Sequence, residues 1–223
     1  MKRGRLRVVL GAAPGVGKTY EMLEEGQRLQ GDGIDVVIAF VETHGRVATA
    51  AQASGLPEVP RHVRGHRGVE LAEMDVDAVI ARAPKIALVD ELAHTNAPGS
   101  RNEKRWQDVD AIRDAGIDVI TTVNIQHLES RNDAVSANTG IVQRETVPDE
   151  VARAAEQIEL VDMSPESLRR RMAHGNIYAA HKVDAALANY FRPGNLAALR
   201  EMALLWLADK VDAGMDGYRA QHG

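Results

Sequence analysis

The stretch GAAPGVGKTYEML, which runs from Gly11 to Leu23, places three glycines, a lysine and a threonine directly after an apolar run. Glycine lets backbone amides turn toward a ligand, and the N-terminus of a following helix adds partial positive charge. The spacing from Ala12 to Gly17, Lys18 and Thr19 fits a looser Walker A pattern, in which alanine replaces the first glycine. These residues predict a loop that binds phosphate.

The predicted phosphate loop implies ATP and Mg²⁺ as ligands. Lys18 is expected to reach the β- and γ-phosphates, and the Thr19 hydroxyl is expected to bind the metal ion. The alternative is an ordinary glycine-rich turn, but an apolar run precedes the loop and a small or apolar helix face follows it. The expected nucleotide-binding residues are Ala12, Ala13, Pro14, Gly15, Val16, Gly17, Lys18, Thr19, Tyr20 and Asn124.

A second motif, PKIALVDELAHTN, ends an apolar run in an acidic pair and has the form of Walker B. Asp90 is expected to hold Mg²⁺ together with Thr19. Glu91 is the candidate catalytic residue, which would orient or deprotonate a nucleophile if phosphate is hydrolysed or transferred. An acidic pair alone fits a plain strand end equally well, and the preceding Walker A motif favours the metal site.

Further polar residues follow other apolar runs. In an open α/β sheet, ligands bind beyond the carboxyl ends of the strands. We therefore expect Glu42 near the metal, and Asn124 or Gln126 near the terminal phosphate or an attacking water. Loop polarity and helix capping are the alternative explanation. The basic residues after Walker B are Arg101, Lys104 and Arg105, interpreted first as a solvated loop and second as a contact to transferred phosphate.

These motifs must be positioned by alternating strands and helices. Strands are predicted at 6–10, 35–41, 86–90, 117–123 and 158–162, and more weakly near 59–63 and 141–147. Helices are predicted at 18–30, 46–54, 70–82, 104–115, 150–156, 165–173, 178–191 and 196–213. The order predicts an α/β, P-loop NTPase-like fold, with a mostly parallel doubly wound sheet, helices on both faces and a helical C-terminal extension.

The chain is expected to divide into a P-loop nucleotide-binding domain over 1–175 and a helical extension or linker over 176–223. Ser164 is expected to cap a helix that starts at Pro165. The Pro193-Gly194 pair is expected to break the chain before a further helix capped by Asn195.

Composition narrows the classes of function. The formal net charge of −5 gives no general attraction to nucleic acid or anionic lipid. Cysteine is absent, which excludes disulfides and thiolate metal sites. The longest uninterrupted apolar stretch covers 202–208, far short of the about 20 residues that a membrane span needs. We expect a cytoplasmic chain, on the cytoplasmic side of the membrane if it belongs to a longer sensor, with no direct membrane insertion.

Beyond these motifs, the stretches VETHGR, VDELAHTNAPGSRNEKRWQDV, AGIDVITTVNIQHLESRND, RETVPD and YFRPGNLAALRE follow in order. With them the chain resembles the N-terminal cytoplasmic domain of the Kdp-type osmosensitive potassium sensor histidine kinases. The resemblance implies a regulatory ATP-binding domain in potassium homeostasis. It implies partners among other domains or subunits of a potassium sensor kinase or a potassium transporter. The region 176–186 departs from the family pattern and receives no role.

Three functions compete at this point. The first is a regulatory switch that binds ATP and Mg²⁺ and alters a partner. The second is phosphoryl transfer to water or to a protein hydroxyl, such as a serine/threonine-kinase-like reaction on a potassium-transport partner, with Glu91 as base. The third is a scaffold whose phosphate loop only supports the fold. No histidine-kinase core is found in the sequence, and homo-oligomerisation stays an open expectation.

Overall fold

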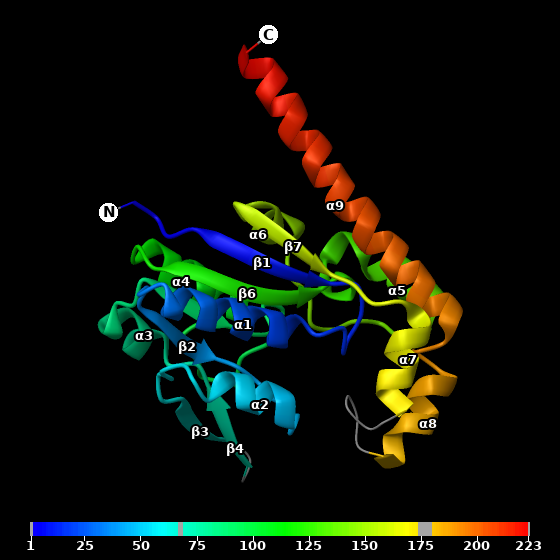
Figure 1. The fold of residues 1–223 in the computed structure, drawn as a ribbon, viewed down its shortest axis with the longest axis horizontal. Coiled ribbons are helices and arrows are strands. Elements are labelled where there is room, and N and C mark those ends of the chain that lie inside the picture. The colour runs from blue at the N-terminus through cyan, green and yellow to red at the C-terminus, as the bar shows by residue number, and fades with distance from the viewer. Residues whose placement is uncertain (1, 67–68, 174–179, 223) are drawn as a thin grey trace.

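The computed structural model describes residues 2–66, 69–173 and 180–222 (Figure 1). Its central sheet has five parallel strands in the order β2-β5-β6-β1-β7. The strands are β1 (Leu6–Gly11), β2 (Val36–Phe40), β5 (Ile86–Val89), β6 (Asp118–Asn124) and β7 (Gln157–Val161). The five strong strand predictions are confirmed to within one residue at each end.

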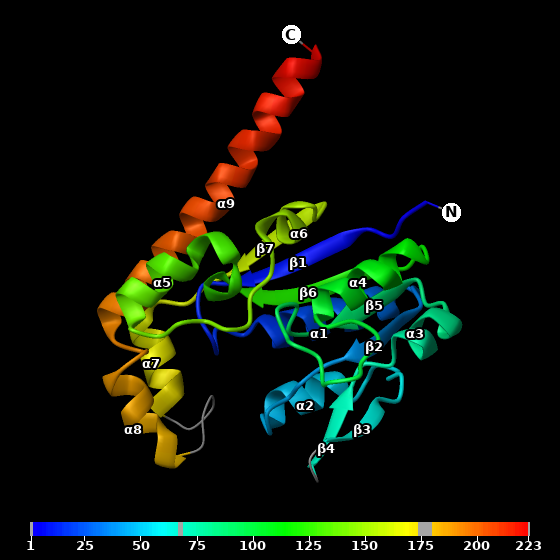
Figure 2. The same cartoon turned by 180° about the vertical axis from the view of Figure 1, so that it is seen from behind.

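Helices cover both faces of the sheet, because the central strands carry buried apolar side chains on both sides. Val9, Leu88 and Ile120 face α1, whereas Val8 and Val119 face the opposite layer, which contains α4. Figures 1 and 2 show α1 in front of the sheet in one view and α4 in front of it in the other. The helices are α1 (Lys18–Gly31), α2 (Val47–Ala53), α3 (Val76–Arg82), α4 (Arg105–Asp114), α5 (Asn132–Thr139), α6 (Asp149–Arg153), α7 (Pro165–Ala173), α8 (Ala180–Ala188) and α9 (Pro193–His222). The predicted doubly wound α/β class is therefore confirmed.

A hairpin outside the main sheet corrects one helix prediction. The segment predicted as a helix over 70–82 forms the strand β4 (Val69–Glu73) and then the shorter helix α3. Strand β4 pairs antiparallel with β3 (His62–His66), which is the weak strand expected near 59–63. The signal for the helix start was Asp75, whose carboxylate accepts a hydrogen bond from the amide of Ala78 at 2.9 Å.

The segment over 141–147 was wrongly predicted as a strand. It makes only an isolated bridge, between Val147 and Leu128. The helix α5 before it was not predicted, because only Val135 of its residues is buried and its apolar pattern is correspondingly weak.

The C-terminal helices agree in part with the predictions made from the sequence. Ser164 caps α7 as expected, accepting a hydrogen bond from the Ser167 amide at 3.2 Å. Helix α9 begins at Pro193, so the Pro-Gly pair starts the helix rather than breaking the chain. Asn195 lies inside α9, where its amide donates to the carbonyls of Asn189 and Tyr190 instead of capping.

The first half of α9 packs on the domain and its second half extends away from it (Figure 1). Leu199, Ala203 and Trp206 are fully buried, and the Trp206 indole donates to the Asp149 carboxylate at 2.7 Å. The predicted domain boundary at 175/176 lies in the segment 174–179, outside the described residues. None of the helices in the described ranges combines the length and apolar character that crossing a bilayer requires.

Candidate functional site

The glycine-rich loop predicted to bind phosphate joins β1 to α1 and depends on glycine at two points. Gly17 caps α1 with φ at 117°, a conformation that a side chain would strain. A Cβ atom on Gly11 would lie 2.5 Å from Cδ of Lys18 and 2.9 Å from Oδ1 of Asn124. Gly11 therefore leaves the space through which the lysine side chain folds back. The Walker A pattern gave this residue no role, although its position directly after an apolar strand could have suggested one.

Lys18 reaches across the sheet edge to a residue far away in sequence. Its Nζ atom donates a hydrogen bond to Oδ1 of Asn124 at 2.6 Å. Burial lowers the pKa of Lys18 to about 8, and the charge of nearby Asp90 opposes the shift. Asn124 thus lies beside the glycine-rich loop, next to Lys18.

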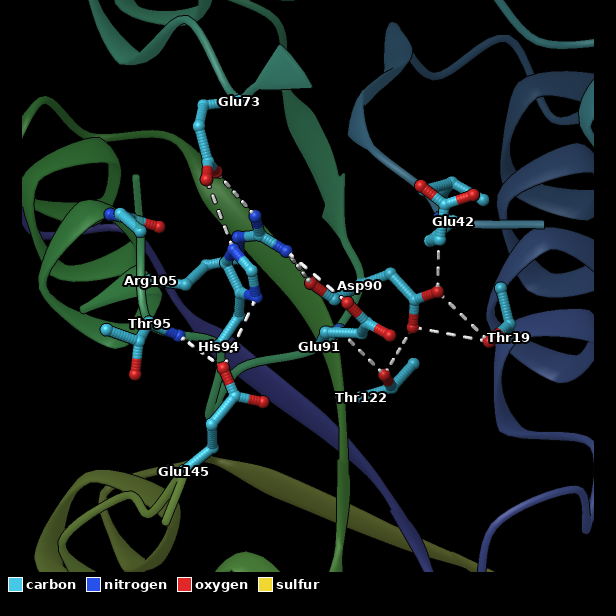
Figure 3. A network of polar contacts seen from close by, with 12 residues as sticks. Thr19, Glu42, Glu73, Asp90, Glu91, His94, Thr95, Arg105, Thr122 and Glu145 are labelled. Carbon is cyan, nitrogen blue, oxygen red and sulfur yellow. Dashed lines mark hydrogen bonds and ion pairs between the residues drawn. The ribbon is translucent and has the colours of Figure 1, made fainter. Parts of the chain in front are cut away.

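Asp90 lies at the end of β5 and is buried in a ring of hydrogen-bond donors (Figure 3). The Thr19 hydroxyl lies 3.1 and 3.2 Å from its two carboxylate oxygens, and Thr122 donates to Oδ1. The amide of Glu42 lies 3.4 Å from Oδ2. Burial raises the pKa of Asp90, while the hydrogen bond from Thr122 opposes the shift. The two predicted metal ligands, Thr19 and Asp90, are therefore in direct contact.

Glu91 has a backbone conformation that is uncommon for a residue with a side chain, with φ at 58°. Its amide donates to the Thr122 hydroxyl at 3.1 Å. Its carboxylate lies 3.1 Å from Nε2 of His44 and 3.8 Å from Nη1 of Arg105. Desolvation disfavours the Glu91 anion, but the hydrogen bond and charge of His44 outweigh it, so the pKa of Glu91 lies below its ordinary value.

Arg105 lies beneath this site rather than on its surface. Its side chain is fully buried and its guanidinium lies 3.7 Å from the centre of the Phe40 ring. Nη2 donates to the carboxylate of Glu73 at 3.0 Å (Figure 3). Glu73 also lies 3.2 Å from Nε2 of His94. The prediction that Arg105 belongs to a solvated basic loop is therefore wrong, because the carboxylates of Glu73 and Glu91 hold it inside.

The two other basic residues after Walker B also have partners of their own. Arg101 pairs with Asp77 at the exposed surface, and Nζ of Lys104 donates to the Thr95 hydroxyl at 2.7 Å. Glu42 contributes its amide to Asp90, whereas its carboxylate lies 3.4 Å from Arg61. The interpretation of Arg101 and Lys104 as surface residues agrees with these contacts.

The loop, Asp90 and Glu91 enclose one cavity of about 430 Å³. Its lining residues are Pro14, Gly15, Lys18, Thr19, His44, Arg46, Asp90, Glu91, Leu92, Ala93, His94, Thr122, Val123, Asn124, Gln126, His127 and Glu145. Of the expected loop residues, Ala12, Ala13 and Val16 are instead buried in the core. Arg46 and Glu145 were not among the expected site residues, since neither lies in a recognised chemical motif.

The donors fit a magnesium ion that is completed by phosphate and water. Among the described residues, no group of three or more His, Cys, Asp or Glu side chains could hold a metal ion. Mg²⁺ is commonly bound by one or two carboxylates together with substrate phosphates and waters. The Thr19 hydroxyl lies 3.1 Å from Oδ2 of Asp90, so one hydroxyl and one carboxylate are close enough together to bind the same ion.

A parallel sheet with a glycine-rich loop after β1 and a buried acid at the end of β5 defines a P-loop NTPase-like α/β domain. The family KdpD, described as an osmosensitive K⁺ channel His kinase sensor domain, matches residues 2–211, and the chain belongs to this family.

Several similar proteins match the sequence of this chain along almost its whole length. It is 64% identical over 219 residues to the sensor protein KdpD of Mycobacterium tuberculosis (strain ATCC 25618 / H37Rv), which covers 98% of this chain and 26% of that protein. It is 52% identical over 221 residues to sensor protein KdpD of Escherichia coli (strain K12), covering 99% and 25% of the two chains. The corresponding protein of Clostridium acetobutylicum is 46% identical over 221 residues, again covering 99% and 25%. The chain thus spans about a quarter of the length of these relatives.

Proposed function

We propose that this chain binds ATP with Mg²⁺ and acts as a regulatory nucleotide switch within a potassium-sensing two-component sensor kinase. The observation that carries the proposal is the convergence of Lys18, Thr19 and Asp90 on one cavity. Lys18 and Thr19 begin α1 after the loop that follows β1, Asp90 directly follows β5, and the parallel sheet places the ends of both strands at the same edge. Membership of the KdpD family supplies the sensor-kinase context.

The residues of the cavity have separate tasks in this proposal. The loop amides between 12 and 19 would hold phosphate oxygens, and the Lys18 ammonium would neutralise part of their charge. Asp90 and Thr19 would hold Mg²⁺, which supplies positive charge that bridges phosphate oxygens. Asn124 holds the lysine in place through the bond at 2.6 Å. Binding would then be reported to other domains of the sensor or to a potassium-transport partner.

One observation favours phosphoryl transfer as the second candidate function. The Glu91 carboxylate lines the same cavity as Lys18 and Asp90, where a general base would be needed. Against it, that carboxylate is already engaged by His44 and Arg105, and its lowered pKa makes it a weaker base. The engaged carboxylate supports the switch over an efficient enzyme.

Replacing Lys18 by alanine tests the proposal. Lys18→Ala should weaken ATP binding at least about tenfold, because a charge-assisted phosphate contact contributes about 1.5–3 kcal/mol. Calorimetric titration with ATP and Mg²⁺ measures the affinity, and circular dichroism confirms that the variant folds. Phosphate release by the wild-type chain, measured in parallel, separates the two candidates. Equal ATP affinity in both proteins would exclude the proposed site.

A further inference from the structure

A second recess lies against the phosphate loop and has a strongly cationic lining. Its residues are Gly15, Gly17, Lys18, Thr19, Tyr20, Arg46, Thr49 and Arg171. Three of the eight are cationic, and no carboxylate is among them. The recess shares Gly15, Lys18, Thr19 and Arg46 with the main cavity, whereas Asp90, Glu91 and Asn124 line only the main cavity. The positive charges converge here on the amino end of α1, which itself favours anions.

Arg171 is the only residue of this lining that comes from the C-terminal helices. Its Nη1 atom lies 3.6 Å from the position that a Cβ atom on Gly17 would take. The guanidinium therefore lies against the loop backbone at the residue that starts α1. Within the described part of the chain, no ion pair with an acidic side chain holds Arg171 away from the loop.

Helix α7, which carries Arg171, is firmly attached to the rest of the molecule. Leu168 and Met172 are buried in the core, and α7 packs against α8 and α9. Arg169 donates to the carbonyl of Leu187 at 2.9 Å and to that of Phe191. A ligand that changes the position of the Arg171 side chain would therefore also affect α7 and, through its packing, α8 and α9.

We propose that Arg171 is a nucleotide-binding residue that contacts the inner phosphates of the bound nucleotide and so couples nucleotide binding to α7, α8 and α9. This inference rests on the proposed function. The position of Arg171 relative to the loop determines which phosphates its guanidinium contacts. The terminal phosphate belongs near Glu91 and Asn124 in the main cavity, whereas Arg171 faces Gly17 and the start of α1. Arg171 should therefore matter equally for ATP and for ADP.

The test compares Arg171→Ala with Arg170→Ala, which removes the same charge from the exposed neighbouring position of α7. Calorimetric titrations with Mg²⁺ and ATP, and with Mg²⁺ and ADP, should show at least about fivefold weaker binding of both nucleotides to Arg171→Ala, as expected for a charge-assisted hydrogen bond. Arg170→Ala should stay within about twofold of the wild type. Arg171→Lys should lie between, since it keeps the charge and loses the planar fork.

Hydrogen exchange supplies a second readout that does not depend on affinity alone. Saturating ADP should slow amide exchange in α7 of the wild type and of Arg170→Ala, and should leave it unchanged in Arg171→Ala. Wild-type affinities in Arg171→Ala, together with a loss in Lys18→Ala, would overturn the role of Arg171 and leave the nucleotide site intact. A loss confined to ATP would overturn the inner-phosphate assignment. A wild-type chain that binds neither nucleotide overturns the proposed function and this inference together.

Discussion

Glu91 shows how a single backbone angle arranges the chemistry of the site. A φ of 58° is costly for a residue with a side chain, and such residues persist where the surroundings hold them. Here the Glu91 amide is held by Thr122, which also donates to Asp90. One threonine therefore fixes both acids of the pair, directing Asp90 toward Thr19 and Glu91 toward His44.

Replacing Glu91 by glutamine decides between switch and enzyme. Glutamine keeps the shape but removes the basic carboxylate, so ATP affinity should stay within about threefold of the wild type, because Glu91 is not expected to ligate the metal. Wild-type phosphate release should already be close to background, and Glu91→Gln should change it little. A fast wild-type reaction that the substitution slows by about 10²–10⁴-fold would instead establish Glu91 as a base. A fast reaction that survives the substitution would indicate Glu42, rather than Glu91, as the candidate base.

The contact between His44 and Glu91 should make stability depend on pH. Glu91 raises the pKa of His44 above its ordinary 6.5, so the contact contributes fully below that pH and is lost as pH rises through the folded-state value. The lowered pKa of Glu91 keeps its own contribution present above its ordinary 4.5 and removes it as pH falls further. His44→Gln should therefore destabilise the chain more near pH 5.5 than near pH 8.

Urea unfolding of wild type and His44→Gln at both pH values measures this difference. Its size should stay below about 1 kcal/mol, because both side chains are more than a third exposed. Equal destabilisation at the two pH values would show that protonated His44 does not stabilise the fold.

At the scale of elements, Arg105 joins three parts of the chain. Its guanidinium binds Glu73 at the end of β4, stacks on Phe40 of β2 and lies 3.4 Å from the Asp90 carbonyl after β5. The hairpin of β3 and β4 is thereby attached to the Walker B segment. Removing one partner of such a buried pair leaves the other charge uncompensated.

Arg105→Ala should destabilise the chain by about 3–5 kcal/mol for this reason. The matched control is Arg82→Ala, which breaks a solvent-exposed ion pair with Asp35 at 2.7 Å and should destabilise the chain far less. Urea unfolding measures both. Equal losses in the two variants would mean that the buried network contributes no more to stability than the exposed pair.

The elements differ in how far the sequence determines them locally. Strands β1, β2, β5 and β6 could be predicted because both of their faces are buried, which makes the runs mostly apolar, whereas β7 at the sheet edge is only partly buried and was recognised from its apolar residues. Strand β4 could not be separated from α3, since VELAEMDV permits both periodicities until the Asp75 cap is recognised. Lys18, Thr19 and Asp90 are found by spacing within short motifs.

Pairings between distant residues are not visible in such motifs. Arg105 was expected in a solvated loop because its neighbours are polar and basic, and its partner Glu73 lies 32 positions earlier. Arg171 lies more than 150 positions after Gly17, which it approaches. The local pattern records the chemistry of a residue, whereas the fold decides which other residue it meets.

At the scale of the molecule, this chain should not phosphorylate itself on histidine. Its sequence has no recognisable phosphoacceptor helix or histidine-kinase ATP lid, and the proposed nucleotide cavity is built on a glycine-rich loop. Incubation with labelled ATP should therefore leave no acid-labile label, with an active histidine kinase as positive control. Acid-labile phosphate on any of its eight histidines, located by mass spectrometry, would contradict this expectation.

Helix α9 works geometrically as a lever. It is 30 residues long, which corresponds to roughly 45 Å at 1.5 Å per residue. Among its residues whose side chains are described, Lys210 makes the last contacts to the domain, donating to the carbonyls of Arg153 and Ala155, so about 18 Å of helix extends past this point. A tilt of about 10° there would move the far end by roughly 3 Å. A rotation too small to disturb the packing around Trp206 would therefore shift the end of the helix by nearly the distance between two side chains in contact.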